Sequence, residues 1–270
     1  MASFSVVTNI SASNAQANLS MTGLGLQKAI TRLSSGFRIN SAGDDAAGLA
    51  VANTYRGTQA VLNQGVRNAN DGLSTLQIKD GALSNISTLL DRLSTLATQS
   101  ASGSSSVDRT QLNNEFQSVL GEIDREANVA GLQASTGFSV FVSNDGGNGA
   151  VGGTIGASDT VALALKVSGT NIDISTSGAA ATAVSTIAAA VTTLGTAQGT
   201  VGTLENRLQF AINLANSQIV SNKAAESRIR DANIAEESAN MSRFSVLNQS
   251  GIAALAQANQ QSSAVLSLLR

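Results

Sequence analysis

Two adjacent carboxylates, Asp44 and Asp45, are the side chains of this sequence best suited to chemistry. A carboxylate pair can bind a metal ion or act as a general acid and base. The pair lies in LSSGFRINSAGDDAAGLAVAN, residues 33–53, where glycines and small residues separate two helical patterns. Ser41 precedes Asp44 at a capping-box-like spacing, and acids in a first turn gain about 0.3–1 kcal/mol each from the helix dipole. Because no third ligand is nearby, we predict that the pair starts a helix.

A second motif, GNGAVG from Gly147 to Gly152, has the glycine spacing of a dinucleotide-binding loop, and Asp173 follows it downstream. That chemistry requires the glycines to open a helix whose N-terminus holds the pyrophosphate. The sequence that follows is turn-like and then strand-like, so we predict a β turn. The overlapping run SNDGGNG has too few carboxylates for calcium. We therefore expect no cofactor and no metal site.

The composition excludes most enzyme classes. The 270 residues include no Pro, Cys, His or Trp, and aromatic residues make up 3%. Without Cys or His there is no thiol nucleophile, Ser-His-Asp triad, imidazole base or zinc site of the usual ligands. We therefore expect a protein that is not an enzyme.

Charge and hydropathy give further expectations about partners. The net charge is −2 and the 16 Lys and Arg residues are scattered, so no nucleic-acid surface is predicted. We read no apolar run that approaches the roughly 18–20 residues needed to cross a bilayer, so membrane insertion is not expected. The first residues lack a basic leader and a long apolar stretch, so export without a cleaved signal peptide is expected.

Apolar residues recur at alternating spacings of three and four, a pattern typical of helices packed at small crossing angles. The segments that show it are residues 19–37, 76–97, 112–130, 201–215 and 234–269. An ordinary globular bundle has the same pattern, but the chain length and the few bulky residues favour rods. We predict a mainly α fold, an elongated antiparallel helical bundle or coiled-coil rod with a small β-hairpin insert in the middle of the chain.

The insert is expected at about residues 136–178, which are rich in Gly, Ser and Thr. Apolar residues alternate from Val161 to Val167 and again at Ile172 and Ile174, which predicts short strands joined by glycine-rich turns. Because helical patterns flank the insert on both sides, we expect the chain ends to pair antiparallel, with residue 10 near residue 260. The insert would then lie at the far tip.

That antiparallel pairing would bring opposite charges together. Residues 1–43 contain basic side chains but no acid, and acids cluster near the other end. The basic set is Lys28, Arg32 and Arg38, and the acidic set is Asp231, Glu236 and Glu237. The alternative is two independently solvated faces.

Long motifs at both ends resemble those of a known family. LSSGFRINSAGDDAAGLAVAN, RNANDGLSTLQIKDGAL and LATQSA are similar to the N-terminal region of bacterial flagellins, and the segment from ESRIRDANIAEESAN to LSLLR is similar to their C-terminus. The resemblance covers roughly residues 1–130 and 195–270, with the motifs in the family's order.

The resemblance implies a short flagellin that lacks the outer variable domains. Residues 1–43 and 230–270 would be the two halves of the inner filament-core domain, largely disordered in the free subunit. Residues 44–229 would be the helical rod domain. The implied function is that of a structural subunit that self-assembles into the helical, extracellular flagellar filament used for motility.

The resemblance also assigns roles to individual residues. The inter-domain joint would comprise Ser41, Gly43, Asp44 and Asp45. The filament-core packing residues would be Leu19, Leu26, Ile30, Leu33, Met241, Phe244, Ile252, Leu255, Leu266, Leu268 and Leu269. The last three also resemble the leucines read by a cytosolic flagellin sensor.

A surface for an immune receptor or for contacts between subunits is implied at Arg92, Leu96 and Glu115. This sequence has Asp91 where a strongly stimulating flagellin has Gln, and Thr95 where it has Glu. The partners implied are further copies of the chain, the export apparatus and its chaperone, filament-cap and hook-junction proteins, and innate immune flagellin receptors.

Other functions remain open at this point. A hook–filament junction protein has a similar plan, although we expect a poorer match to NSAGDDAAG and LSLLR. A secreted helical adhesin or translocator could share the rods but does not require matched motifs at both termini. An enzyme that uses only carboxylates is the remaining alternative.

Overall fold

The computed structural model of the chain describes residues 9–102, 108–143, 149–167 and 170–267, and no side chain beyond residue 260. It is mainly helical with a small antiparallel sheet in mid-chain, which confirms the predicted fold class. The chain divides into two compact units. We call residues 1–57 with 221–270 the terminal unit and residues 58–220 the central unit.

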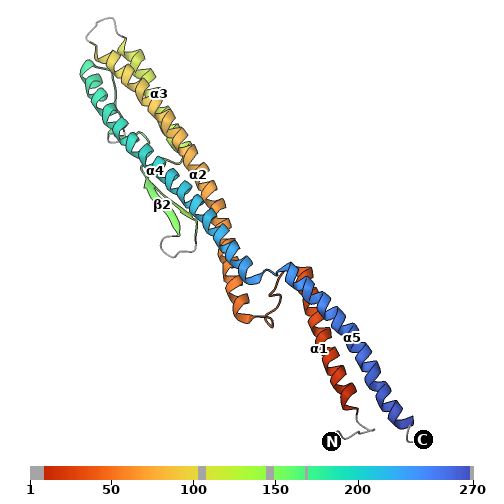
Figure 1. The fold of residues 1–270 in the computed structure, drawn as a ribbon. Coiled ribbons are helices and arrows are strands. Elements are labelled where there is room, and N and C mark those ends of the chain that lie inside the picture. The colour runs from red at the N-terminus through yellow and green to blue at the C-terminus, as the bar shows by residue number, and fades with distance from the viewer. Residues whose placement is uncertain (1–8, 103–107, 144–148, 168–169, 268–270) are drawn as a thin grey trace. The chain divides into compact units, whose positions relative to one another are not determined.

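The terminal unit is built on two helices that run side by side, α1 (Ile10–Ser35) and α5 (Ile234–Ser267) (Figure 1). The Asn9 side chain, which caps α1, donates through Nδ2 to the carbonyl of Ala258 at 2.9 Å. The two helices are therefore antiparallel, and the prediction that residue 10 lies near residue 260 is confirmed.

The central unit packs three helices, α2 (Ala46–Ala101), α3 (Arg109–Val129) and α4 (Ser177–Arg230). The first turns of α2 and the last turns of α4 belong to the terminal unit. The residues of the predicted series from Leu76 to Ala97 are all fully buried, together with most of the series on α3 and α4. Apolar side chains at three-four spacing thus form a continuous core between these helices.

Polar side chains define both ends of α3. Asp108 caps its start by accepting from backbone N–H groups of the first turn. At its other end, the Lys79 ammonium donates to the carbonyls of Ala130 (3.0 Å) and Gly131 (3.2 Å). A cation here satisfies carbonyls that have no helical partner. Burial lowers the pKa of Lys79.

The hairpin lies along the helices of the central unit rather than at a tip (Figure 1). Strands β1 (Thr136–Phe141) and β2 (Ala150–Ile155) pair antiparallel. The chain just after β1 approaches Gly65 of α2 so closely that a Cβ there would lie 1.7 Å from the carbonyl oxygen of Val142. The predicted position at the far tip is therefore wrong, because glycines on α2 allow the hairpin to pack against the helix flank.

The second half of the insert contains little strand. The strands β3 (Lys166–Val167) and β4 (Thr170–Asn171) form a two-residue ladder. The alternating run before them is a turn, in which the N–H of Leu163 donates to the carbonyl of Asp159 at 3.0 Å. The predicted strand over residues 161–165 is wrong, since the turn buries Leu163 and its neighbour Leu165 in the core.

A polar stripe on α3 holds this irregular segment. Asn113, Gln117 and Asp124 are spaced by four and seven residues, so they share one helix face. They bond the backbone of the insert at Ile174 N–H (3.0 Å), Ile172 C=O (2.8 Å) and Thr160 N–H (3.0 Å). Side chains thus supply hydrogen bonds that a sheet would otherwise provide.

Within the described residues one helix, α4, is long and apolar enough to cross a membrane, judged by length and composition alone. The expectation that the sequence contains no such stretch is therefore wrong. Two of its apolar side chains, Ile187 and Leu194, are part of the central core.

Candidate functional site

The adjacent carboxylates have different structural roles. Asp45 caps α2, because its Oδ1 accepts from the N–H of Gly48 at 2.9 Å. Asp44 lies before the helix, and its Oδ2 accepts from the N–H groups of Asn40 (3.2 Å) and Ser41 (3.1 Å). The predicted cap at Ser41 is therefore wrong, because the helix cap lies four residues later, at Asp45. The prediction that the acid pair starts a helix is confirmed for Asp45 alone.

Asp44 also forms an ion pair with Lys28 of α1, with Oδ1 2.8 Å from Nζ. The hydrogen bond from Lys28 and then the N–H of Ser41 lower the pKa of Asp44 far below its usual range. A carboxyl group held ionised in this way fastens the chain to α1 and cannot act as a general acid near neutral pH. No group of three or more acids that could hold a metal ion occurs within the described ranges.

The glycine motif does not open a helix. Gly147 lies outside the described residues, and Gly149 precedes β2 directly. The described glycine is thus followed by a strand, β2, as the sequence predicted. A pyrophosphate would need the N-terminus of a helix at this point, and β2 does not provide one.

Two short connectors lie in the terminal unit. The first, residues 36–45, links α1 to α2, and the second, residues 231–233, links α4 to α5. The first begins at Gly36, whose φ of +75° is a left-handed conformation that favours glycine. Ala232 N–H donates to the carbonyl of Gly36 across the two connectors (2.8 Å), and Arg38 N–H donates to the carbonyl of Arg230 at the end of α4 (2.6 Å). We call these bonded connectors the joint.

Arg230, the last residue of α4, contacts the first connector through its side chain. The guanidinium carbon lies 4.1 Å from the centroid of the Phe37 ring, and Nε donates to the carbonyl of Ile39 at 3.4 Å. Ile39 itself is 1% exposed. No pattern in the sequence predicted these contacts, because Arg230 and Ile39 are 191 residues apart and belong to no shared motif.

One predicted ion pair joins α1 and α5. Arg32 Nη1 lies 2.9 Å from Glu237 Oε1, and the two side chains are 24% and 10% exposed. A pair this shielded is weakened less by salt than a surface pair. The prediction that basic and acidic groups of the two ends meet is confirmed at this pair.

The remaining charged residues have other partners than predicted. Lys28 forms its ion pair with Asp44. Arg38 Nη2 donates to the carbonyl of Ile229 at 2.8 Å, and Asp231 accepts from the hydroxyl of Ser227 at 2.6 Å. Arg38 thus satisfies a carbonyl at the C-terminus of α4. Glu236 lies in the first turn of α5, where the helix dipole favours a carboxylate.

Glycines bring α1 and α5 close together at two points. A Cβ at Gly25 would lie 2.7 Å from the Phe244 ring, and one at Gly251 would lie 3.1 Å from Leu19 Cδ1. Leu19 and Phe244, which the sequence assigned to filament packing, therefore contact the partner helix of the same chain.

Much of the apolar surface of this helix pair faces solvent. Of the predicted packing residues, Leu26, Leu33, Met241 and Leu255 are half-buried, whereas Ile30 and Ile252 are 49% and 55% exposed. Met21, Leu24 and Val246, which were not predicted, are 70%, 65% and 61% exposed. Met21 and Leu24 are three residues apart, so they share one face of α1.

The terminal leucines lie at the end of the described part of the chain or beyond it. Leu268 and Leu269 are outside the described residues, and Leu266 follows the last described side chain of α5.

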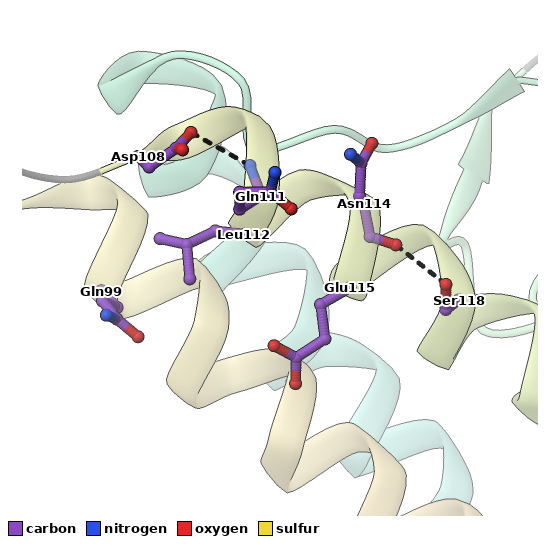
Figure 2. A pocket seen from close by; sticks show the side chains of 7 residues that line it. All are labelled: Gln99, Asp108, Gln111, Leu112, Asn114, Glu115 and Ser118. Atoms are coloured by element: carbon purple, nitrogen blue, oxygen red, sulfur yellow. Dashed lines mark hydrogen bonds between the residues drawn. The ribbon is translucent and has the colours of Figure 1, made fainter.

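A groove of about 640 Å³ lies where the end of α2 meets the start of α3. Side chains such as Gln99, Leu112 and Glu115 line it (Figure 2). Glu115 accepts from Nε of Arg92 at 2.9 Å, and these two side chains are 45% and 54% exposed. Leu96 is 1% exposed and packs in the core. It is not part of the surface with Arg92, contrary to what the resemblance implied.

Comparison with known proteins gives matches at both ends of the chain. Residues 6–149 match the family model of the bacterial flagellin N-terminal helical region, and residues 184–269 match that of the C-terminal helical region. The chain is 35% identical to a flagellin of Halalkalibacterium halodurans over 97% of its own length and 98% of the relative's. It is 34% identical to flagellin FlaB1 of Treponema pallidum over the same shares.

A solved structure is also similar. The crystal structure of Bacillus cereus flagellin aligns with 55% of this chain and 88% of its own, at 28% identity and a TM-score of 0.47.

Proposed function

Because the chain belongs to the bacterial flagellin family and is a structural subunit of the extracellular flagellar filament, we propose that α1 and α5 form the filament core. In this proposal they pack against the same helices of other copies. The observation that carries it is the apolar surface that the helix pair leaves exposed, at Met21, Leu24 and Val246 above all.

Exposed apolar surface of this kind requires a partner. Within α1, Ala29 is the one described residue that is fully buried, although the helix carries an apolar stripe. Contiguous apolar surface on a soluble protein commonly marks an interaction site. Further copies of the chain can cover it repeatedly, since each copy brings the same two helices.

The same proposal divides the chain by role. Residues 1–43 and 230–270 form the inner core, residues 44–229 form the rod around it, and the joint links the two. The ion pair between Arg32 and Glu237 supports this division, because it holds the two inner segments together.

Seeded growth tests the role of the terminal helices. Short filament seeds are mixed with the full chain or with a chain of residues 44–229, and growth is followed by electron microscopy. We expect growth with the full chain and a soluble, helical monomer without the termini. Filaments of the shortened chain would contradict the proposal.

A point variant sharpens the same experiment. Met21→Gln with Leu24→Gln removes the exposed apolar face of α1 without touching a buried residue, so we expect seeded growth to fall at least about tenfold. Val129→Gln is the matched control, because Val129 is 73% exposed but lies on α3 in the central unit. Equal losses in the two variants would argue against a specific role for α1.

We also propose that Arg92 and Glu115 belong to a surface that contacts an innate immune flagellin receptor or a neighbouring subunit. Support comes from their exposure and from the groove beside them (Figure 2). Asp91 lowers the local positive potential, so Asp91→Gln should strengthen and Arg92→Ala should weaken binding to a receptor ectodomain. If a binding titration shows no change in either variant, the surface is only a subunit contact.

The remaining partners would use the apolar surface outside the filament. An export chaperone would cover α1 and α5 before assembly, and filament-cap and hook-junction proteins would cover them at the filament ends. Co-purification of the chaperone with the full chain but not with residues 44–229 is the expected result. Equal recovery with both chains would contradict this assignment.

A further inference from the structure

Each helix of the terminal unit has a glycine where the other helix places a large apolar side chain. Leu19 of α1 packs against Gly251 of α5, and Phe244 of α5 packs against Gly25 of α1. We call these two contacts the glycine slots. A Cβ at Gly25 would lie 2.7 Å from the nearest atom of the Phe244 ring, which is closer than packed carbon atoms approach. The slots therefore exist only because neither position carries a side chain.

The glycine slots agree with two polar contacts on a single alignment of the helices. The contacting residues on α5 follow one another at intervals of seven, so they lie along one face of that helix. In order, they are Ala258, Gly251, Phe244 and Glu237. Their partners on the α1 side come in the reverse order along the chain. These are Asn9, Leu19, Gly25 and Arg32.

A slip of one helical turn would fill both glycine slots with side chains. Phe244 would face Met21 or Ala29 in place of Gly25, because residues four apart lie on one face of a helix. Leu19 would face a leucine on α5 in either direction. The helices would have to move apart to make room for these side chains. The slipped pairing therefore loses the close approach that the structure shows.

We propose that Gly25 and Gly251 are the positioning residues of the helix pair: each accepts one large side chain of the opposite helix, so that α1 and α5 pair in one register when a subunit joins the filament. The inference rests on the proposed role of these helices in the filament core and deepens it. It requires no pairing in the free subunit, where both segments are expected to be largely disordered. One register gives every added copy the same surface, which a regular helical assembly needs.

Introduced cysteines report the register, since the chain itself has none. A Cβ at Gly251 would lie 3.8 Å from Leu19 Cβ, which is close to the mean separation in disulfides. We expect Leu19→Cys with Gly251→Cys to form a bond within one chain when filaments grown from seeds are oxidised and analysed by mass spectrometry. Leu19→Cys with Leu255→Cys, one turn away on α5, is the matched control and should not form the bond. Equal yields in the two pairs, whether high or zero, would overturn the inference.

Alanine substitutions test the glycine slots themselves. Gly25→Ala places a methyl group against the Phe244 ring, so the subunit concentration left free when seeded growth stops should rise at least about fivefold. Gly23→Ala is the matched control, because a Cβ there meets no atom of the described chain within 4 Å. It should leave that concentration unchanged or lower it, since alanine favours a helix over glycine.

A second substitution shows whether the effect of Gly25→Ala passes through the ring. In a chain that already carries Phe244→Ala, Gly25→Ala should no longer raise the free subunit concentration, because the methyl group then has room. Independent, additive effects of the two substitutions would overturn the inference.

The inference and the proposed function fail in different ways. Filaments grown from residues 44–229 alone would contradict the proposed function, and the cysteine pairs would still report the register of α1 and α5 in filaments of the full chain. If only the full chain grows but the two cysteine pairs form equal amounts of the bond, the register inference alone is wrong.

Discussion

The central and terminal units carry the same three-four apolar pattern but bury it differently. In the central unit, Leu83, Leu90 and Phe116 are fully buried by helices of the same chain. In the terminal unit, Met21 is 70% exposed, although it lies on an equally regular helix. The comparison teaches that periodicity identifies which residues favour burial, but it does not identify which molecule covers them.

The two units also use polar contacts differently. In the central unit, polar side chains such as Lys79 and Gln117 hold helix ends and the insert around an existing core. In the terminal unit, the ion pair of Arg32 and Glu237 and the bonds of the joint hold together helices that share little buried apolar surface. Polar contacts are therefore a larger share of what fixes the terminal unit.

The largest expected contrast is in the loss of stability when a large apolar side chain is truncated in the central unit or in the terminal unit. Phe116→Ala should lower the free energy of unfolding by about 3–5 kcal/mol, because it leaves a cavity among fully buried side chains. Met21→Ala should change it by less than about 0.5 kcal/mol in the free subunit, since the side chain is already in water. Thermal unfolding followed by circular dichroism measures both, and equal losses would contradict the contrast.

The close contact between α2 and the hairpin predicts the next largest effect. Gly65→Ala places a methyl group 1.7 Å from the carbonyl oxygen of Val142, so the hairpin must shift and stability should fall by about 1–3 kcal/mol. Gly81→Ala is the matched control on the same helix. A Cβ at Gly81 meets no atom within 4 Å, so stability should rise by up to about 1 kcal/mol. Chemical denaturation of both variants measures the difference, and a loss at Gly81 as large as at Gly65 would argue against the close contact.

A smaller effect, with a pH dependence, is expected at Glu205 of α4. Burial, and then the charge of Asp80, raise the pKa of Glu205, whose Oε1 is buried without a hydrogen-bond partner among the described residues. A raised folded-state pKa means that the ionised form is penalised in the native protein. The free energy of unfolding therefore rises as the pH falls through the folded-state pKa of Glu205. The penalty on the ionised form is fully removed below the unfolded-state pKa of the same group.

Glu205→Gln should remove that dependence. We expect the variant to melt a few degrees above the unchanged chain at pH 7, and the difference to close as the pH is lowered toward 4. Glu115→Gln, at an exposed residue, controls for the loss of one charge. A difference that stays constant with pH would show that Glu205 is not penalised by its surroundings.

The smallest effect is expected where the central unit exposes an ion pair. Arg92→Ala should lower the free energy of unfolding by less than about 1 kcal/mol, because surface pairs gain little in water. Chemical denaturation of Arg92→Ala, Glu115→Ala and the double variant measures the coupling. A coupling energy well above about 1 kcal/mol would show that the pair stabilises the fold. The effect of Arg92→Ala on receptor binding would then be harder to separate from its effect on stability.

The sequence by itself determined the helical class, the antiparallel pairing of the chain ends and the place of the insert along the chain. Apolar spacing decides which face of a helix is buried, and that spacing is a local property of the chain. The motifs at both ends determined the family for the same reason, since they are contiguous runs of residues. The absence of Cys and His determined which chemistries were unavailable.

Only the tertiary structure decided how those elements meet. The resemblance placed Leu96 on one surface with Arg92, but packing buries Leu96 in the core, and the sequence does not say how wide the buried face of the helix is. Charge clustering predicted the pair of Arg32 and Glu237 but also pairings that do not form. The contacts of Arg230 with Phe37 and Ile39 had no sequence signal, because hydrogen bonds between distant segments depend on the folded path of the chain.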